Sequence, residues 1–409
     1  MTLSSTSATS SPSSWNGSTG STRQPSTSSP SGAAPFRVAA VGLTNPRGMV
    51  WDDAGTMYVA SGGMGGDRLS GPDRHIEAPL GPYRGGPTGQ IYRVDRHGLP
   101  SVFVDGLPST RDQFRGKQGV SDVAWVDGRL YALIAGAGQA HGNPDSETGI
   151  IRIEADGSWE QIAGIGPWHR AHPVPNKVPH YFPEASLFAF TWNPADDAFW
   201  FSEANSNYVG RITMSGEISR VADLSAHNDV LSGITPSPNG GVYVGHMSVV
   251  PYAEGETFVS EVLPDGTVRP AWTGLTMVAG LTHEADGTLI ATFMSTDNTV
   301  ALPHFRPNAG KVVRQTGPDR YETIARDLTL PIKVEVGPDG WLYVATPGIG
   351  ADNGSGIIVA IDPAARDLEL SNATLLKAAE QVRAAGLVAE PDLAPRRYPH
   401  EVVPGEDLA

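Results

Sequence analysis

The chain of 409 residues contains no cysteine. This absence excludes a disulfide framework and any metal site built on thiolates. No apolar run approaches the roughly 18 residues of a membrane-spanning helix, so the sequence predicts no membrane span. The formal net charge of −15 argues against a nucleic-acid backbone or an anionic membrane as the main partner. Partners are therefore expected among small molecules and other proteins.

Acidic residues are also absent from the start of the chain, where Asp52 is the first one. Residues 1–34 contain 19 Ser and Thr and lack the apolar stretch of a secretory signal. Such a segment buries too little apolar surface to offset the entropy of ordering, which predicts a disordered leader. A transit peptide, a low-complexity leader and a misplaced start codon all remain open, so the sequence assigns no compartment.

Glycine and proline, in contrast, are abundant, with 48 and 34 residues, as suits a chain with many tight turns. Residues 199–221 form three runs of alternating apolar and polar residues, separated by turn residues. Period-2 alternation of this kind is typical of antiparallel strands with one buried face. Because the same pattern recurs along the chain, we interpret the protein as a repeat protein.

Six repeats can be aligned on their second strand. Each has an apolar first strand, a turn such as Asp-Gly or Asn-Gly, and a second strand centred on Tyr58, Tyr131, Trp200, Tyr243, Ile290 or Tyr343. Four strands repeating at about 45 residues are typical of a propeller blade. The sequence therefore predicts an all-β fold, a six-bladed β-propeller of four-stranded blades over residues 35–363.

The two ends of this propeller are also predicted. Residues 36–43 match the outer strand that the last repeat lacks, so we expect them to complete blade six and close the ring. Residues 364–409 are expected to form a C-terminal helix and a tail. The helix is expected at 372–385, with an apolar face of Leu375, Leu376, Ala379 and Val382 packed on the outside of the propeller.

Several phrases resemble the ScyD/ScyE family of NHL-like propeller proteins. They are residues 42–48 (GLTNPRG), 58–66 (YVASGGMGG), 106–109 (GLPS), 119–122 (GVSD) and 336–344 (VGPDGWLYV). The segment 164–187 departs from the family by its length and its His and Pro content. The resemblance implies a six-bladed propeller and no settled catalytic constellation.

One blade is similar to the repeat of streptogramin B lyases. Its residues are 200–203 (WFSE), 209–212 (VGRI) and 216–218 (GEI). The catalytic Glu-x-His pattern of those lyases is not matched, because the nearest pair, His283-Glu284, falls in a predicted hairpin. The similarity implies the fold and leaves the reaction open.

Long connections are predicted at one end of the central channel. They are the segments 62–87, 135–148, 164–187, 247–256 and 294–308, and each joins second to third strands or one blade to the next. Long loops on one face of a rigid scaffold commonly carry binding residues. We therefore expect a small-molecule ligand at this end.

Two columns of the alignment supply candidate site residues. Glu203 and His246 end the second strands of adjacent blades, where they could share a proton or hold a divalent cation such as Mg or Ca. In that hypothesis Glu203 is the metal ligand and His246 the general base; in the alternative, both bond loop amides. Asp122 and Lys333 would face each other at the channel entry near Arg47, as substrate contacts or as a structural pair.

Histidine and tryptophan placement adds two further interpretations. His169 and His172 could cap the channel as part of a lid or bind substrate, and a packed loop is the alternative. Trp51, Trp125 and Trp192 occupy one column and are interpreted as core between blades.

Four functions remain open from the sequence. The first is a metal-assisted lyase at the loop-bearing end, and the second is a non-catalytic propeller that binds a ligand or a protein. The third is a quinone-dependent sugar dehydrogenase that uses His246, Arg47 and Lys333. The fourth is a lactonase with Asp122, Glu203 and Asn45 as converging ligands. The sequence contains no nucleophile-elbow motif and no phosphate-binding loop.

Overall fold

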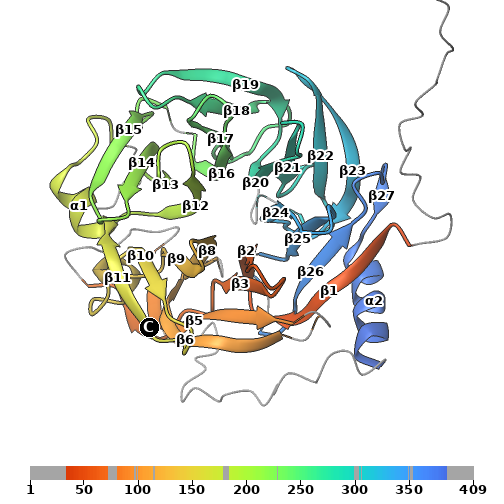
Figure 1. The fold of residues 1–409 in the computed structure, drawn as a ribbon, viewed down its shortest axis with the longest axis horizontal. Helices are drawn as coiled ribbons and strands as arrows, with labels where there is room; N and C mark the ends of the chain where they lie inside the picture. Colours follow the sequence, from red (N-terminus) through yellow and green to blue (C-terminus); the bar gives the residue numbers. More distant parts are fainter. Residues whose placement is uncertain are drawn as a thin grey trace, which may run out of the picture. The chain divides into compact units, whose positions relative to one another are not determined.

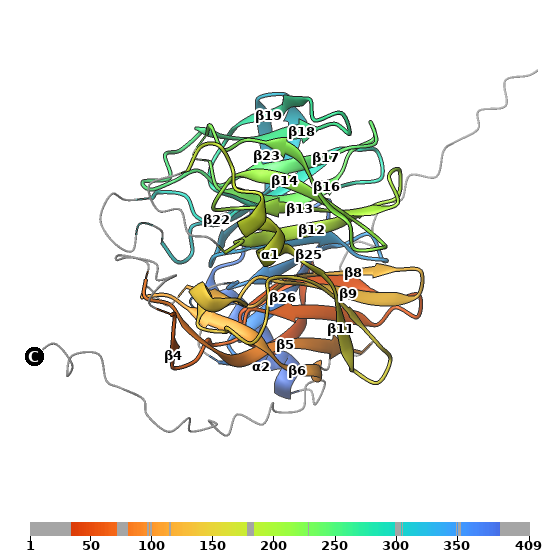
Figure 2. The ribbon, with the colours of Figure 1, turned by 90° about the vertical axis from the view of Figure 1, so that its left-hand side faces the viewer.

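The computed structural model describes residues 34–384 except 72–80, 96–97, 99, 114–115, 178–183, 228, 299–303, 305, 349 and 351–352. Six antiparallel sheets, each with four core strands, form a ring as the blades of a β-propeller (Figure 1). Figure 2 shows the same ring from its edge. The predicted six-bladed all-β propeller is confirmed. No helix in the described part of the chain is long and apolar enough to cross a membrane.

The blades follow one another along the chain. Blade one contains β2 (Pro46–Trp51), β3 (Met57–Ser61), β5 (Arg84–Val94) and β6 (Pro100–Arg111). Blade two contains β8 (Val120–Val126), β9 (Arg129–Ile134), β10 (Gly149–Ile153) and β11 (Trp159–Gly164). Blade three contains β12 (Leu187–Asn193), β13 (Ala198–Glu203), β14 (Tyr208–Thr213) and β15 (Ile218–Asp223).

The second half of the ring has the same plan. Blade four contains β16 (Leu231–Pro236), β17 (Val242–His246), β18 (Thr257–Val262) and β19 (Val268–Leu275). Blade five contains β20 (Val278–His283), β21 (Leu289–Phe293), β22 (Gly310–Gly317) and β23 (Arg320–Leu328). Blade six contains β24 (Lys333–Val336), β25 (Leu342–Thr346), β26 (Gly356–Ile361) and β1 (Phe36–Leu43).

Blade six takes its outer strand from the start of the propeller. β1 pairs antiparallel with β26, with Phe36 opposite Ile361 and Leu43 opposite Gly356. The predicted closure by residues 36–43 is therefore confirmed. Because β26 has a partner on both sides, it presents no free strand edge, and backbone hydrogen bonds close the ring.

Tight turns join the first and second strands and set the register of the blades. In blade two, Asp127 and Gly128 both have positive φ, at 50° and 73°, as a two-residue hairpin turn requires. The second strands all end at the column expected from the sequence, with final residues Ser61, Ile134, Glu203, His246, Phe293 and Thr346. Equivalent residues of different blades therefore lie at equivalent places around the channel.

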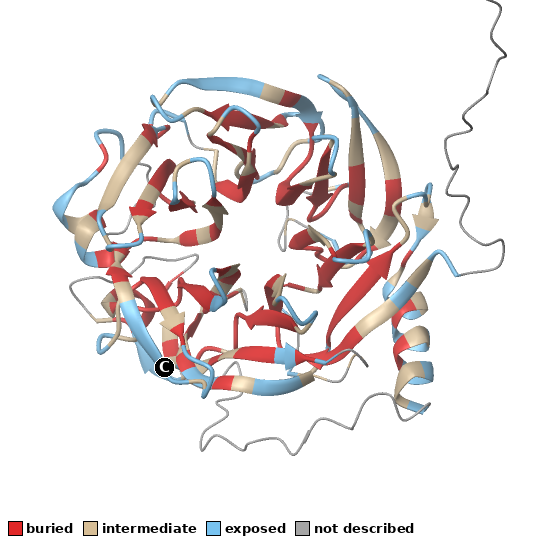
Figure 3. Ribbon diagram, viewed as in Figure 1, coloured by how far each residue is buried: buried red, intermediate tan, exposed pale blue. Residues whose placement is uncertain are grey.

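The hydrophobic core lies between neighbouring blades, where the inner strands are buried (Figure 3). Phe199 of β13 is 0% exposed, and its ring centroid lies 4.9 Å from that of Tyr131 in blade two. Full burial of a phenylalanine side chain contributes about 1.5–3 kcal/mol. Repetition of such contacts around the ring makes each blade depend on its neighbours.

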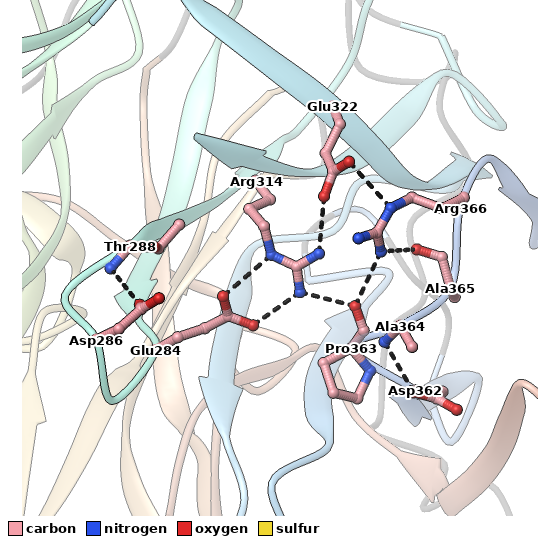
Figure 4. A network of polar contacts seen from close by, with 10 residues as sticks. All are labelled: Glu284, Asp286, Thr288, Arg314, Glu322, Asp362, Pro363, Ala364, Ala365 and Arg366. Carbon is pink, nitrogen blue, oxygen red and sulfur yellow. Dashed lines mark hydrogen bonds and ion pairs between the residues drawn. The ribbon is translucent and has the colours of Figure 1, made fainter. Parts of the chain in front are cut away.

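A polar network fastens the chain after the last blade to blade five (Figure 4). Arg314 of β22 donates to both carboxylate oxygens of Glu284, at 3.0 and 2.7 Å, and to Glu322 at 2.9 Å. The same guanidinium donates to the carbonyl of Pro363 at 2.7 Å. Arg366 pairs with the other oxygen of Glu322 at 2.9 Å. The segment that follows the ring is therefore held by charge-assisted hydrogen bonds.

The C-terminal helix α2 (Asn372–Ala384) follows, after β27 (Leu368–Glu369) has paired in parallel with β23. Ser371 caps it by accepting a hydrogen bond from the amide of Thr374 at 3.3 Å. Leu375 and Ala379 are buried against the outer side of the propeller core, which confirms the predicted helix. Leu376 is 44% exposed, so the apolar face is narrower than the sequence indicated.

Two segments expected to be loops contain regular structure. In blade one, β4 (Arg68–Leu69) pairs with an extended β5. A side chain at Gly66 would collide with the carbonyl oxygen of Gly85, so glycine permits this close approach. The segment 164–187 contains the helix α1 (Ile165–Ala171). Pro167 lies in its first turn, where a missing N–H costs no helical hydrogen bond.

Candidate functional site

The central channel is lined by the first strands of the blades and differs at its two ends. At the end where these strands begin, the loop end, there is a void of about 10 Å³. Its lining residues are Arg47, Gly48, Ser121, Asp122, Phe188, Ala189, Gly233, Ala279, Ile332 and Lys333. At the other end, the hairpin end, the strands enter their tight turns around a cavity of about 390 Å³. The larger space thus lies opposite the long connections.

An ion pair separates the two ends. Lys333 Nζ lies 3.0 Å from Asp122 Oδ2 and 3.0 Å from Glu335 Oε1. Burial raises the pKa of Asp122, and the ammonium of Lys333 acts against this shift. Burial also disfavours the ammonium, but the two carboxylates outweigh it and hold the pKa of Lys333 above its usual value. Asp122 and Lys333, expected to face each other, are therefore in direct contact.

The surroundings of this ion pair come from several blades. The amide of Phe190 in blade three donates to Asp122 at 3.3 Å, and Thr282 of blade five donates to Glu335 Oε2 at 3.2 Å. A side chain on Gly48 of blade one would collide with the Asp122 carboxylate. Glycine at this position therefore makes room for the ion pair at the centre of the ring.

Arg47 borders the void at the loop end and is 9% exposed. Its Nη2 donates to the carbonyl of Lys117, while its Nε is buried without an acceptor. Burial lowers the pKa of Arg47 to about 10. A void of this size holds about one water molecule. Arg47 thus lies at the channel entry as expected, with space for little more than a water beside it.

Glu203 is fully buried and its carboxylate binds backbone amides. Oε1 accepts from Ser186 at 2.8 Å and from Asn205 at 3.3 Å, and Oε2 accepts from Ser206 at 2.5 Å. Burial raises the pKa of Glu203 to about 7, although these three amides act in the opposite direction. The arrangement organises the turn after β13 and occupies the oxygens that a metal ion would need.

His246 is 1% exposed and its partners lie within or beside its own blade. Nε2 lies 3.0 Å from Ser260 Oγ, and Nδ1 lies 3.4 Å from Asp229 Oδ2. The ring stacks on Phe258 with centroids 4.0 Å apart. The structure thus does not join His246 to Glu203. It places Asp229, His246 and Ser260 in series, with a hydrogen bond between His246 and the 2% exposed Ser260 and no hydrogen-bond geometry at Nδ1.

His169 and His172 both belong to α1 and its C-terminal cap, at the outer rim of blades two and three (Figure 1). His169 is 0% exposed, with Nδ1 3.2 Å from Tyr208 Oη, and burial lowers its pKa to about 4. His172 is exposed and stacks on Trp168 at 4.5 Å. Because α1 packs against the blade core, the described residues give the expected lid no support, and substrate contact by His169 and His172 stays a prediction. The neighbouring His180 lies outside the described residues.

The hairpin-end cavity is built mainly from apolar and aromatic side chains. It is lined by Met49, Val50, Trp51, Val123, Ala124, Trp125, Phe190, Thr191, Trp192, Lys333, Glu335, Val336, Gly337 and Pro338. Trp51 meets Tyr343 of blade six edge-on at 4.8 Å, and Trp125 stacks on Tyr58 of blade one at 5.9 Å. These tryptophans do pack between blades, as predicted, but they also line an open space that the sequence did not indicate.

Several functional candidates were missed at the sequence level. Glu335 could have been found, because it lies two residues after Lys333 and successive even positions of a strand share a face. No sequence pattern around Asp229 or Ser260 indicates contact with His246. Strand pairing brings Ser260 to His246, and a connection between blades brings Asp229 there. Among the described residues, no group of three or more His, Asp and Glu side chains is placed to hold a metal ion.

Comparison with known proteins gives likenesses of fold. No family model and no curated protein sequence matches the chain. Among solved structures, a streptogramin B lyase is 14% identical, with 80% of this chain and 97% of that chain covered and a TM-score of 0.44. A catalytically inactive variant of virginiamycin B lyase from Staphylococcus aureus is 14% identical, with 80% and 99% covered and a TM-score of 0.41.

A gluconolactonase from Xanthomonas campestris gives a similar result. It is 12% identical, with 80% of this chain and 89% of that chain covered and a TM-score of 0.48. At these identities and scores the comparisons carry no argument about function. The chain is similar to these propellers in architecture.

Proposed function

We propose that the protein is a non-catalytic propeller that binds a small molecule in its hairpin-end cavity. The observation that carries the proposal is the cavity itself. Its volume of about 390 Å³ lies within the range of about 300–1,000 Å³ found for small-molecule pockets. Its apolar walls surround a few polar groups, Lys333, Glu335 and Thr191, at fixed positions. Such a composition is typical of a ligand site.

The loop end offers less support for a ligand. Arg47, Asp122 and Lys333 enclose only about 10 Å³ there, so a ligand larger than water would have to displace side chains. Binding at the long loops stays a prediction. The proposal therefore keeps the central channel as the binding region and assigns the ligand to its other end.

Catalytic alternatives find little geometric support among the described residues. A metal-assisted lyase needs Glu203 to ligate and His246 to act as base, but backbone amides hold Glu203 and Asp229 and Ser260 hold His246. A quinone-dependent dehydrogenase would need the buried imidazole of His246 to meet its substrate. A lactonase would need Asp122 to converge with Glu203, whereas Asp122 is paired with Lys333.

The resemblance to the ScyD/ScyE family agrees with a binding role, because that resemblance implies no settled catalytic constellation. Membership stays a prediction. It rests on five phrases, of which those at 42–48 and 58–66 include the start of β2 and the end of β3.

The proposal is tested by blocking the cavity. Wild type and Thr191→Trp are titrated by calorimetry with indole, benzyl alcohol, benzylammonium chloride and sodium benzoate. Thr191 lines the cavity and is half-buried, so the larger side chain fills the space. Thr273→Trp on the exposed outer strand of blade four is the matched control.

Binding of at least one probe by wild type and by Thr273→Trp, with loss in Thr191→Trp, is the expected result. Thermal unfolding of all three proteins verifies that they are folded. A folded wild type that binds none of the four probes, or equal binding by Thr191→Trp, would overturn the proposal.

A further inference from the structure

Lys333 and Glu335 line the floor of the hairpin-end cavity, and Asp122, which lines the void at the loop end, contacts the same ammonium. Lys333 contributes one ammonium, and Asp122 and Glu335 contribute two carboxylates, each 3.0 Å from it. The side chains of Asp122 and Lys333 are 1% and 8% exposed, whereas that of Glu335 is 28% exposed. A molecule in the cavity therefore meets the carboxylate of Glu335, while the ammonium is screened by its two partners.

The rim of the cavity is acidic as well. Acidic residues occupy the first turns of the blades that line it, close after the lining residues: Asp52, Asp53, Asp127, Asp196, Asp197 and Asp339. Arg211 pairs with Asp196, and Arg37 pairs with Asp339. The other four have no ion-pair partner in the described part of the chain, and the basic residue Arg129 begins β9 directly after the Asp127-Gly128 turn. The potential at the mouth is therefore negative, in line with a net charge of −15.

Three tryptophans supply the walls between this rim and the floor. Trp51, Trp125 and Trp192 line the cavity and are half-buried. Each contacts another aromatic ring, with centroid distances of 4.8 Å to Tyr343, 5.9 Å to Tyr58 and 5.0 Å to Phe199, respectively. Indole rings held in this way are preorganised, so binding needs little ordering of the site.

From these observations we propose that the hairpin-end cavity selects an organic cation, an ammonium group carried on an apolar body. This inference rests on the proposed binding function of the same cavity. Tryptophan is the aromatic side chain that attracts cations best, and the carboxylate of Glu335 provides a charged acceptor at the floor. An organic anion would meet Glu335 and the acidic rim, so repulsion disfavours it. A neutral aromatic molecule uses the walls and gains nothing from the charge.

The test compares probes of matched shape that differ in charge. Benzylammonium, benzyl alcohol and benzoate are titrated by calorimetry into wild type, Glu335→Gln and Trp192→Leu at low ionic strength. Glutamine keeps an acceptor for the hydroxyl of Thr282 and leaves Lys333 paired with Asp122, so this variant preserves the central ion pair. Glu217→Gln, an exposed position in the outer turn of blade three, is the matched control.

Wild type and Glu217→Gln are expected to bind benzylammonium at least about tenfold more tightly than benzyl alcohol, and benzoate most weakly. Glu335→Gln is expected to lose that tenfold preference while it retains benzyl alcohol binding. Trp192→Leu is expected to weaken benzylammonium binding by about 3- to 30-fold. Benzyltrimethylammonium tells the two contacts apart, because it engages the indole rings without donating to Glu335.

The results of this test distinguish failure of cation selection from failure of the binding function on which it rests. Equal affinity of wild type for benzylammonium and benzyl alcohol, or an unchanged preference in folded Glu335→Gln, would overturn cation selection and leave the binding function standing. Failure of every probe to bind folded wild type would overturn both.

Discussion

Replacement of Lys333 with methionine removes the ammonium that Asp122 contacts at the centre of the ring. At a separation of 3.0 Å, the Coulomb attraction is about 5 kcal/mol with an effective dielectric constant of about 20. Desolvation of both groups offsets part of it, but loss of one partner leaves the other charge buried and unpaired. Lys333→Met is therefore expected to reduce the free energy of unfolding by about 3–5 kcal/mol.

Substitution of Asp122, the partner of Lys333, is expected to reduce the free energy of unfolding by less. Asp122→Asn leaves Lys333 paired with Glu335 at 3.0 Å, and the amide oxygen can still accept from Phe190. We expect a loss of about 1–3 kcal/mol from the weakened hydrogen bonds. The double variant, Lys333→Met with Asp122→Asn, leaves neither member of this pair as an unpaired charge. Its loss of unfolding free energy should therefore be smaller than the sum of the two single losses by at least about 1.5 kcal/mol.

Urea denaturation followed by circular dichroism measures all four proteins of this cycle. The control is Arg68→Met, because the ion pair of Arg68 with Asp145 is 57% and 85% exposed and should contribute less than about 1 kcal/mol. Additive single losses within about 0.5 kcal/mol would refute the reasoning, since they would mean that the two side chains do not interact energetically.

Three further outcomes follow from buried groups elsewhere in the propeller. Burial raises the pKa of Glu203 from 4.5 to about 7. As pH rises through that range, the free energy of unfolding of wild type should therefore fall by up to about 3 kcal/mol relative to that of Glu203→Gln. Parallel pH profiles of unfolding for the two proteins would contradict this. Burial lowers the pKa of His169 from 6.5 to about 4. As pH falls from 6.5 to 4, the free energy of unfolding of wild type should therefore decrease by up to about 3 kcal/mol relative to that of His169→Gln. Equal acid sensitivity of the two proteins would argue against this. Arg47→Met should be neutral or stabilising by about 1 kcal/mol in urea denaturation, because it removes a buried charge whose Nε has no acceptor; a large loss would indicate an anionic partner.

Metal removal tests the remaining catalytic hypothesis. Elemental analysis and thermal unfolding are compared before and after chelation in wild type and Glu203→Ala. The backbone amides on Glu203 lead us to expect unchanged melting in wild type after chelation. A stoichiometric ion that disappears in Glu203→Ala would restore the metal-assisted lyase.

Much of the fold could be predicted because propeller blades repeat a local pattern. The alternation around Tyr58, Tyr131 and Trp200 specifies which residues face the neighbouring blade, and the Asp-Gly turns specify where strands reverse. Alignment of the repeats then placed Asp122 and Lys333 in one column at the channel, where the structure joins them. In a repeat protein, alignment of the repeats shows which residues far apart in the sequence occupy equivalent positions in the fold. A fold without repeats offers no such alignment.

The candidate site was harder to predict because it depends on contacts that do not repeat. Gly164, Gly166 and Pro167 read as a loop, and the helix α1 forms there because Ile165 can be buried against blades two and three. The partners of Glu203 are backbone amides, which no residue type reveals. The hairpin-end cavity is lined by residues of four blades, and their arrangement around the channel is a property of the whole ring.

The central ion pair connects the stability of the propeller with the proposed selectivity of its cavity. A channel lined by six strands leaves space at its centre. The side chain of Lys333 from blade six fills this space, and the carboxylate of Asp122 from blade two neutralises the ammonium. With Asp122 alone as partner, the ion pair would be neutral and would offer no carboxylate to the hairpin end. Glu335, two residues along the same strand face, adds that carboxylate 3.0 Å from the ammonium. The same lysine can therefore hold the ring together without repelling a cation from the cavity above it.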